Sequence, residues 1–306
     1  MKLVKQLLRN PLSLTGIVLI VGFILIALLA PVIAPPDDPE DRFDIPRSGY
    51  RAQPEPPSWL SDEEDLSPGD EDWHWLGTTE GQYDIFYALI WGTRTAFKAG
   101  LTVTFASLFI GLTIGTVAAY YGGRVDEFLM RIVEVFMAFP FLLAAMTVAT
   151  VLQPRLGKGI WTPMVALIVF GWTGYARLIR GDVLSVKQRE YVLASRVAGA
   201  GDLRIMLRHI LPNAIFPTMV VASMDIGTNV LSFATLSFLG VGVQKGYADW
   251  GQVISFARNW IPVLDEFWFI IVFPGLTISL YVLGWNLLGD AFRDILDPRM
   301  RGSRGA

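Results

Sequence analysis

Long apolar stretches are the feature that most limits what this chain can fold into. The first runs from Leu12 to Ala34, and a helix of that length covers about 34 Å at ~1.5 Å per residue, enough to cross a bilayer. The 306 residues are 53% hydrophobic and 17% charged, which is too apolar for a soluble protein of this size. The sequence therefore predicts an all-α integral membrane protein.

A cleaved signal peptide is the competing interpretation of the first stretch, because Lys2, Lys5 and Arg9 precede it. The apolar core of a signal peptide is about 7–15 residues long, which is shorter than the run seen here. We therefore interpret residues 1–34 as a cytoplasmic amino terminus followed by an uncleaved first transmembrane helix.

Five further spans are predicted, which makes six transmembrane helices in all. They are Phe97–Tyr121, Phe128–Leu152, Trp161–Ile179, Ala214–Val243 and Phe267–Leu288. A re-entrant or interfacial stretch, Gln244–Glu266, precedes the last of them. In the second span, Gly111 and Gly115 are four residues apart, a spacing at which small residues let helices approach closely. We interpret this pair first as a packing signal and only second as a dimer interface.

Residues 35–84 have a different composition from the rest of the chain. They contain fifteen Asp or Glu and three Arg, and eight of the eighteen prolines lie between residues 35 and 68. Such a segment cannot bury enough apolar surface to offset the entropy lost on ordering, so most of it is predicted to be irregular and solvated. Trp59, Trp73, Trp75 and Tyr83 are exceptions that could hold it at the membrane interface or against a partner.

The segment Glu190–Asn213 is polar and lies between two predicted spans. Its first half has good helix formers, and the run that begins at Gly199 then interrupts the helix. Asp202 is placed to cap a second helix by accepting hydrogen bonds from its first turn. Pro212 is expected to break or kink that helix. The pattern predicts a short helix, a tight turn and a second short helix at a membrane surface.

This pattern resembles the "EAA" coupling loop of ABC importer permeases, in which a glycine is followed thirteen residues later by the proline of an I-x-L-P ending. Gly199 and Pro212 have that spacing. The dipeptide and oligopeptide branch, whose version reads roughly Y-V-x-A-A-R-x-x-G-A…R-H-I-L-P-N, is more similar still. The matching positions are Tyr191, Val192, Ala194, Arg196, Gly199, Ala200 and Arg208–Asn213.

The chain departs from the general signature at three positions. Leu193 stands where that signature has Glu, Ser195 where it has its second Ala, and His209 where its ending has isoleucine. The first and third departures are usual in the peptide branch. The opening NPLSLTG and the ending GDAFRDILDPRMRGSRGA also resemble the C-type permease of that branch.

The resemblance implies a type I ABC importer permease fold and a position in a larger complex. The partners it implies are a second homologous permease, one or two cytoplasmic ATPase subunits, an external solute-binding protein and the lipid bilayer, with no nucleic acid and no cofactor. The implied location is the bacterial or archaeal cytoplasmic membrane. The resemblance also implies that the ATPase contacts the coupling loop at Tyr191, Ala194, Ser195, Arg196, Gly199, Ala200, Asp202 and Pro212.

On this basis the chain divides into four parts. Residues 1–34 form the amino terminus and first span, and 35–92 form an acidic, proline-rich extracytoplasmic segment. Residues 93–290 form a five-helix transport core that includes the coupling loop at 186–213. Residues 291–306 form the tail.

The distribution of basic residues predicts the orientation without reference to any family. Counting six spans places the amino terminus, the second connection, the coupling loop and the tail on one side. That side holds sixteen of the twenty-five Lys and Arg, so both termini and the coupling loop are expected in the cytoplasm.

Several functions are disfavoured by what the sequence lacks. It has no cysteine and only two histidines, so thiolate chemistry is excluded and a histidine-rich metal site is not expected. It contains no G-x-x-x-x-G-K-[ST] phosphate loop, so we expect a transport subunit that is not itself an ATPase. The substrate is expected to be a di- or oligopeptide, with nickel or another small solute as the alternative and an ion-coupled secondary transporter as a weaker one.

Three polar residues within the predicted spans are candidates for the pathway or for helix packing. Asp225 lies in the fifth span, and a charge there costs roughly 2.5–3.5 kcal/mol on insertion scales, so it is not expected to face lipid. Asn229 lies four residues later and should share its helical face. Glu134, in the third span, is the remaining candidate. Asp225 could either pair with a neighbouring helix or help to pass the amino group of a peptide.

Overall fold

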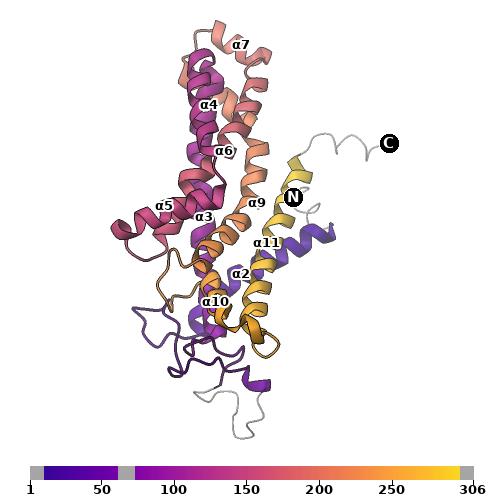
Figure 1. Cartoon of the computed structure of the whole chain (residues 1–306). Helices are drawn as coiled ribbons and strands as arrows, with labels where there is room; N and C mark the ends of the chain where they lie inside the picture. Colours follow the sequence, from indigo (N-terminus) through magenta and orange to yellow (C-terminus); the bar gives the residue numbers. More distant parts are fainter. Residues whose placement is uncertain (1–9, 61–72, 297–306) are drawn as a thin grey trace.

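The computed structural model describes residues 10–60 and 73–296, and within these ranges the regular structure is entirely helical (Figure 1). The long helices are α2 (Pro11–Ile33), α3 (Ile85–Tyr121), α6 (Trp161–Val186), α9 (Leu211–Phe238) and α11 (Phe269–Leu296). The shorter ones are α4 (Gly123–Met137), α5 (Phe141–Leu156), α7 (Glu190–Val197), α8 (Asp202–Ile205) and α10 (Trp250–Phe256). The described chain also contains two short 3₁₀ helices, η1 (Ser58–Leu60) and η3 (Ala257–Val263), and one π-helical turn, η2 (Met206–Ile210).

Among the described residues, five helices are long and apolar enough to cross a membrane, and α4 with α5 makes a sixth span if the bent pair is counted as one. The third predicted span, Phe128–Leu152, is therefore not a continuous helix. Its two halves meet at an angle of 87°. Pro140 begins the second half, where it disfavours helical geometry in the residue before it and supplies no N–H.

The second span begins earlier than the hydropathy pattern predicts. The Asp84 side chain caps α3 by accepting from the Tyr87 backbone N–H at 2.7 Å, so the helix starts at Ile85 and not near Phe97. The added turns carry Trp91 and Arg94, which contact the end of α2.

Glycines in α3 allow its close contact with α6. A Cβ atom built on Gly111 would lie 2.5 Å from Cβ of Tyr175, and one on Gly115 would lie 2.3 Å from the Ala176 carbonyl oxygen. Real Cβ atoms do not approach other atoms this closely. The G-x-x-x-G spacing therefore serves packing between α3 and α6 within one chain, as first interpreted.

Two side chains of α3 form hydrogen bonds with backbone carbonyls of α2 and its carboxyl-terminal cap. Pro31 lies inside α2 and has no N–H to donate to the Ala27 carbonyl, which instead accepts from Arg94 Nε. The neighbouring Trp91 Nε1 donates to the Ala34 carbonyl at 2.8 Å. The first helix is thus held by hydrogen bonds as well as by apolar contact.

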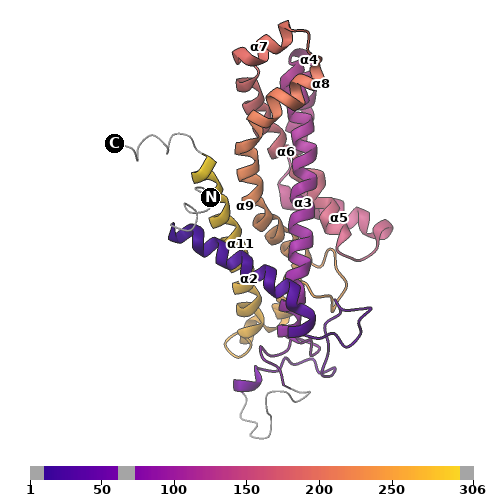
Figure 2. The same ribbon diagram turned by 180° about the vertical axis from the view of Figure 1, so that it is seen from behind.

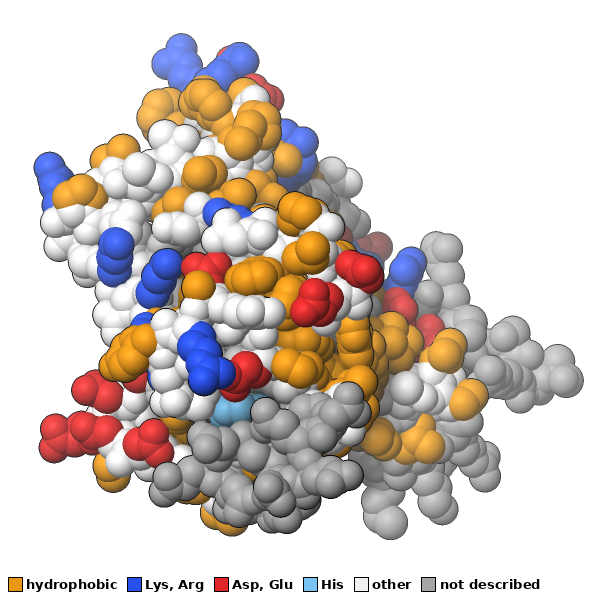
Figure 3. Space-filling model, turned by 60° about the horizontal axis from the view of Figure 1, so that its bottom comes forward, with side chains coloured by type: hydrophobic (Ala, Val, Ile, Leu, Met, Phe, Trp, Pro, Cys, Tyr) orange, Lys and Arg blue, Asp and Glu red, His pale blue; other side chains and the backbone are white. Residues whose placement is uncertain are grey.

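Apart from η1, residues 35–60 and 73–84 of the acidic segment are irregular, as predicted, but parts of them are packed against the bundle. Residues 61–72 of this segment lie outside the described ranges. The Ile45 N–H donates to the Gly246 carbonyl at 2.7 Å, and the Ala248 N–H donates to the Phe43 carbonyl at 2.7 Å. Ile45 is only 5% exposed. The described part of this segment therefore covers the connection between α9 and α10, and Figure 3 shows acidic side chains over this end of the molecule.

The coupling segment (residues 186–213) and the described part of the acidic segment lie at opposite ends of the helices. Figures 1 and 2 show α7 at one end, beyond the long helices, and α10 with the irregular residues at the other. This arrangement agrees with the predicted placement of the two segments on different sides of a membrane.

Replacing Gly115 by alanine tests the contact between α3 and α6. The new methyl group would meet backbone at Ala176, so we expect Gly115→Ala to lower the free energy of unfolding by about 1–3 kcal/mol, the usual cost of overpacking. The measurement is thermal unfolding of the detergent-purified protein. The matched control is Gly22→Ala, because a Cβ there has nothing within 4 Å and alanine favours a helix. Equal melting temperatures for both variants would contradict the contact.

Asp249 caps α10 from a buried position outside the long helices. Its Oδ2 accepts from the Gln252 N–H at 3.0 Å, and the residue is 3% exposed. Burial raises the pKa of Asp249 from its ordinary 3.8 to about 6, because the charged form is desolvated. The ionised carboxylate is therefore more costly in the folded protein than in the unfolded chain.

This raised pKa predicts a pH-dependent stability. The contribution of Asp249 is complete below about pH 4 and is lost as the pH rises through the folded pKa of about 6. A shift of two units corresponds to about 3 kcal/mol at pH 7.5. Asn also caps helices and does not titrate, so Asp249→Asn should match wild type at pH 3.5 and be more stable at pH 7.5. Melting curves that differ by the same amount at both pH values would disprove this.

Candidate functional site

The coupling segment comprises α7, a turn, α8 and the π-turn η2. Gly199 has a φ of +78°, the left-handed conformation that glycine adopts at little cost. The Ala200 N–H then donates to the Ser195 carbonyl at 3.1 Å, which closes the end of α7. The predicted tight turn is therefore present at the predicted glycine.

Asp202 does not cap α8, contrary to the sequence prediction. The cap residue is Gly201, and no side chain bonds to the first turn. The Asp202 Oδ1 atom instead accepts from the Tyr120 hydroxyl at 2.6 Å. A hydrogen bond to the last turn of α3 thus takes the place of a local cap, and it ties the coupling segment to the bundle.

Pro212 does not break the helix in which it lies. The chain from Asp202 to Phe238 is one helical span, with η2 inserted just before Pro212 in the first turn of α9. A π-turn shifts the hydrogen-bond register, and the first turn of a helix tolerates a residue without an N–H. The expected break is therefore replaced by a local change of helix type.

One face of the coupling segment is buried against the bundle. Val192, Ile205 and Ile210 are at most 1% exposed, and they pack in one apolar cluster with Tyr120 and Val183. Lys187 reinforces this anchor, because its Nζ donates to the carbonyls of Ala119 and Tyr120 at 3.0 and 2.8 Å. The segment is thus fixed to the ends of α3 and α6.

The opposite face is exposed and carries both apolar and charged side chains. Val197 is 89% exposed and Leu203 is 66% exposed. The predicted contact residues Tyr191, Ala194, Arg196 and Asp202 are exposed as well, whereas Ser195 and Ala200 are half-buried. The Ser195 hydroxyl donates within α7, to the Tyr191 carbonyl at 2.8 Å.

Arg196 is not simply a free charge on this surface. Its guanidinium carbon lies 5.5 Å from the centroid of the Tyr120 ring, within reach of a cation–π contact. Arg196 and Asp202 therefore meet through Tyr120, a residue from α3 that sequence reasoning did not single out.

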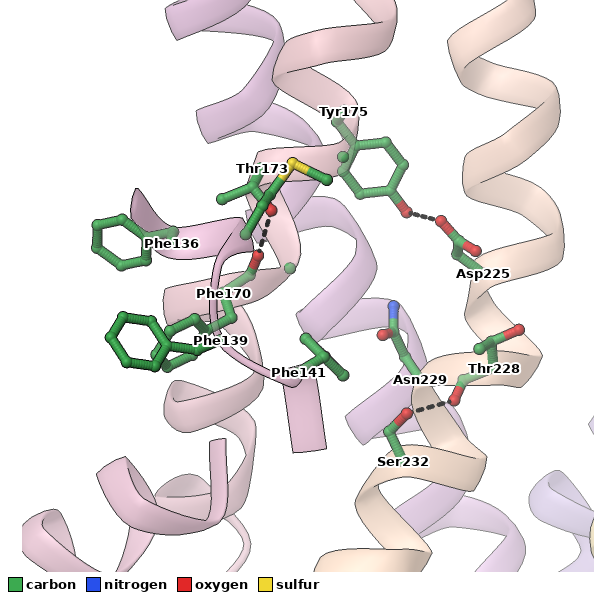
Figure 4. A pocket seen from close by; sticks show the side chains of 13 residues that line it. Phe136, Phe139, Phe141, Phe170, Thr173, Tyr175, Asp225, Thr228, Asn229 and Ser232 are labelled. Carbon is green, nitrogen blue, oxygen red and sulfur yellow. Dashed lines mark hydrogen bonds between the residues drawn. The ribbon is translucent and has the colours of Figure 1, made fainter. Parts of the chain in front are cut away.

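A cavity of about 480 Å³ lies between α4, α6 and α9 (Figure 4). Its lining residues are Phe136, Met137, Phe139, Phe141, Phe170, Gly171, Thr173, Gly174, Tyr175, Asp225, Thr228, Asn229 and Ser232. Asp225 and Asn229 share this lining, as their spacing of four residues predicted. Within the described ranges, no group of three His, Asp or Glu is arranged to hold a metal ion.

Asp225 and Asn229 are each held by a neighbouring helix. The Tyr175 hydroxyl of α6 donates to Asp225 Oδ2 at 2.6 Å, and Asn229 Nδ2 donates to Thr104 Oγ1 of α3 at 2.8 Å. Glu134 is not brought to this site. It lies on α4 with a side chain 55% exposed, paired with Arg131 at 3.3 Å.

Family comparisons place the chain among known transport proteins. The family described as "Binding-protein-dependent transport system inner membrane component" matches residues 111–302. The one described as "N-terminal TM domain of oligopeptide transport permease C" matches residues 2–54.

Individual relatives are similar over most of the chain. A dipeptide transport system permease protein of Alkalihalophilus pseudofirmus is 34% identical over 97% of this chain and 89% of its own length. An oligopeptide transport system permease protein of Bacillus subtilis is 34% identical over 95% and 87%. A glutathione transport system permease protein of Pectobacterium atrosepticum is 39% identical over 77% and 76%.

A solved structure supports the same fold. The inward-facing MetNI methionine ABC transporter contains a chain that superposes with a TM-score of 0.54 at 20% identity, covering 70% of this chain and 98% of that one. The family matches and the near full-length relatives agree with this architecture. The chain therefore belongs to the inner membrane components of binding-protein-dependent transport systems, in their dipeptide and oligopeptide permease branch.

Proposed function

We propose that this chain is one membrane subunit of an ATP-driven peptide importer and that its coupling segment receives the motion of a separate ATPase. The proposal rests on how the coupling segment is packed: one face is buried against the bundle and the other is exposed. Its buried face packs against the ends of α3 and α6. On its outer face, Val197 is 89% exposed and Leu203 66% exposed, and no described part of the chain covers them. A rigidly packed segment that exposes apolar side chains is suited to docking of another protein.

The partners follow from the family and from this surface. The cytoplasmic ATPase covers the outer face of α7 and α8, a second, homologous permease completes the pathway, and an external binding protein delivers the substrate. Both termini and the coupling segment face the cytoplasm, because the basic residues are concentrated on that side. The described part of the acidic segment then lies outside, at the other end of the helices.

Peptides are the proposed substrates because the relatives carry dipeptide, oligopeptide and glutathione names. In the proposed mechanism, ATP binding closes the ATPases, and the coupling segments move with them. The helix bundles then open alternately to the two sides, and the energy comes from outside this chain.

Reconstituted transport tests the function. Proteoliposomes that contain the complete complex should take up a di- or tripeptide only when ATP is supplied on the ATPase side and the binding protein on the other. Withdrawing ATP while keeping a proton gradient should stop uptake, whereas a secondary transporter would continue. Uptake of nickel in place of peptide would refute the substrate class and leave the transporter class intact.

The turn at Gly199 generates a second prediction about coupling. Nothing lies within 4 Å of a Cβ built there, so a larger residue is strained only by its φ of +78°, at a cost of about 1–2 kcal/mol. We expect Gly199→Val to remain in the membrane with its partners but to lose most transport and substrate-stimulated ATP hydrolysis.

Gly201→Val is the matched control for this experiment. Gly201 lies two residues away, has an ordinary φ of −67°, and also has open space around a Cβ. The control should retain most transport. Wild-type uptake by Gly199→Val, or equal losses in both variants, would show that the left-handed turn is not what couples the two subunits.

A further inference from the structure

Asp225 is the one charged residue among the described residues that line the cavity between α4, α6 and α9. In the described part of the chain, no Lys, Arg or His nitrogen lies within 4.0 Å of its carboxylate. Its hydrogen-bond partner is the neutral hydroxyl of Tyr175. Among the described residues, an ionised Asp225 carboxylate therefore has no cationic partner.

The carboxylate is held in a fixed position. Tyr175 is 4% exposed, and its Cβ lies against Gly111 of α3, where even an added methyl group would not fit. This contact positions Tyr175 beside α3, and the tyrosine hydroxyl donates to Asp225 Oδ2 at 2.6 Å. Tyr175 engages Oδ2, and Figure 4 shows the Asp225 carboxylate at the cavity wall beside Thr228 and Asn229.

Aromatic side chains form the opposite wall. Phe136, Phe139, Phe141 and Phe170 all line the cavity, and the rings of Phe136 and Phe170 contact each other with centroids 5.4 Å apart. Ring faces carry partial negative charge and attract cations. A carboxylate opposite aromatic rings is thus suited to an organic ammonium group that is attached to an apolar body.

We infer that this cavity binds the terminal ammonium group of a peptide in transit, with Asp225 as its counter-ion, Tyr175 as the positioning residue for that carboxylate and the phenylalanines as the apolar wall. This inference rests on the proposed function and names a site within it. The volume of about 480 Å³ accommodates a few residues of peptide.

The test compares free-amine and blocked peptides on the intact complex in nanodiscs, without and with the binding protein. Binding of a tripeptide and of its N-acetyl derivative is measured directly, and uptake is measured in proteoliposomes at saturating loaded binding protein. Asp225→Asn removes the charge and keeps the hydrogen bond to Tyr175. It should weaken binding of the free-amine peptide about tenfold, the value of one charge-assisted hydrogen bond. It should leave the N-acetyl peptide unchanged.

Kinetics separate this role from a purely structural one. For the free-amine peptide, Asp225→Asn should lower kcat and leave the KM for loaded binding protein unchanged, because docking does not involve the cavity. Tyr175→Phe should give a smaller loss of the same kind. Asp290→Asn, the same change at an exposed carboxylate of α11, is the matched control and should behave as wild type.

Two outcomes would overturn the inference. Equal losses for both peptides together with a lower yield of complex would show that Asp225 pairs with a cation of the second permease. If wild type and Asp225→Asn each bound the free-amine and the N-acetyl peptide with equal affinity, the cavity would not recognise the amino group. Either result leaves the proposed function standing if wild type still imports peptides with ATP, whereas absence of all ATP-dependent uptake would refute the function itself.

Discussion

The close contact between α3 and α6 is the constraint on which the rest of the structure depends. Gly111 and Gly115 bring the α3 backbone against Tyr175 and Ala176 so tightly that no side chain fits between them. The same contact positions Tyr175, whose hydroxyl donates to Asp225 at the wall of the cavity. Because closely packed interiors do not deform continuously, a shift of α6 must carry both α3 and this side of the cavity with it. Helix packing and the candidate site are therefore one feature.

The far end of α6 connects this rigid pair to the coupling segment. Lys187, just past the end of α6, donates to the last carbonyls of α3, and Tyr120 in that last turn contacts both halves of the segment. Its hydroxyl bonds to Asp202, and its ring lies beneath Arg196. A force applied to α7 or α8 therefore reaches two long helices together and is not absorbed in a loose loop. The two-helix segment is mechanically part of the bundle it is proposed to drive.

Hydropathy predicted the approximate positions of the spans, because a helix in lipid must be apolar along its length and must satisfy its own backbone. It missed the early start of α3 and the bend between α4 and α5. The turn at Gly199 was also predictable, since only local geometry decides it. What sequence could not supply were partners that lie far apart along the chain. Tyr120 and Asp202 are 82 positions apart, and Tyr175 and Asp225 are 50 apart. No periodicity links such residues, so the local cap expected for Asp202 was the natural prediction and was wrong.

The first helix shows how a sequence defect becomes a tertiary contact. Pro31 leaves the Ala27 carbonyl without a donor inside α2, and an unsatisfied carbonyl is costly away from water. Arg94 of α3 would be equally costly there without a partner, and it supplies that hydrogen bond. Trp91 Nε1 donates a second hydrogen bond, to the Ala34 carbonyl. The centroid of the Trp91 ring lies 4.8 Å from the guanidinium carbon of Arg94. The hydrogen bond between Arg94 and the Ala27 carbonyl therefore offsets the cost of burying both polar groups. Lipid tails offer neither a donor nor an acceptor in its place. Helix α2, which lies outside the family match at residues 111–302, is therefore bound to α3. The same helix α3 makes the close contact with α6.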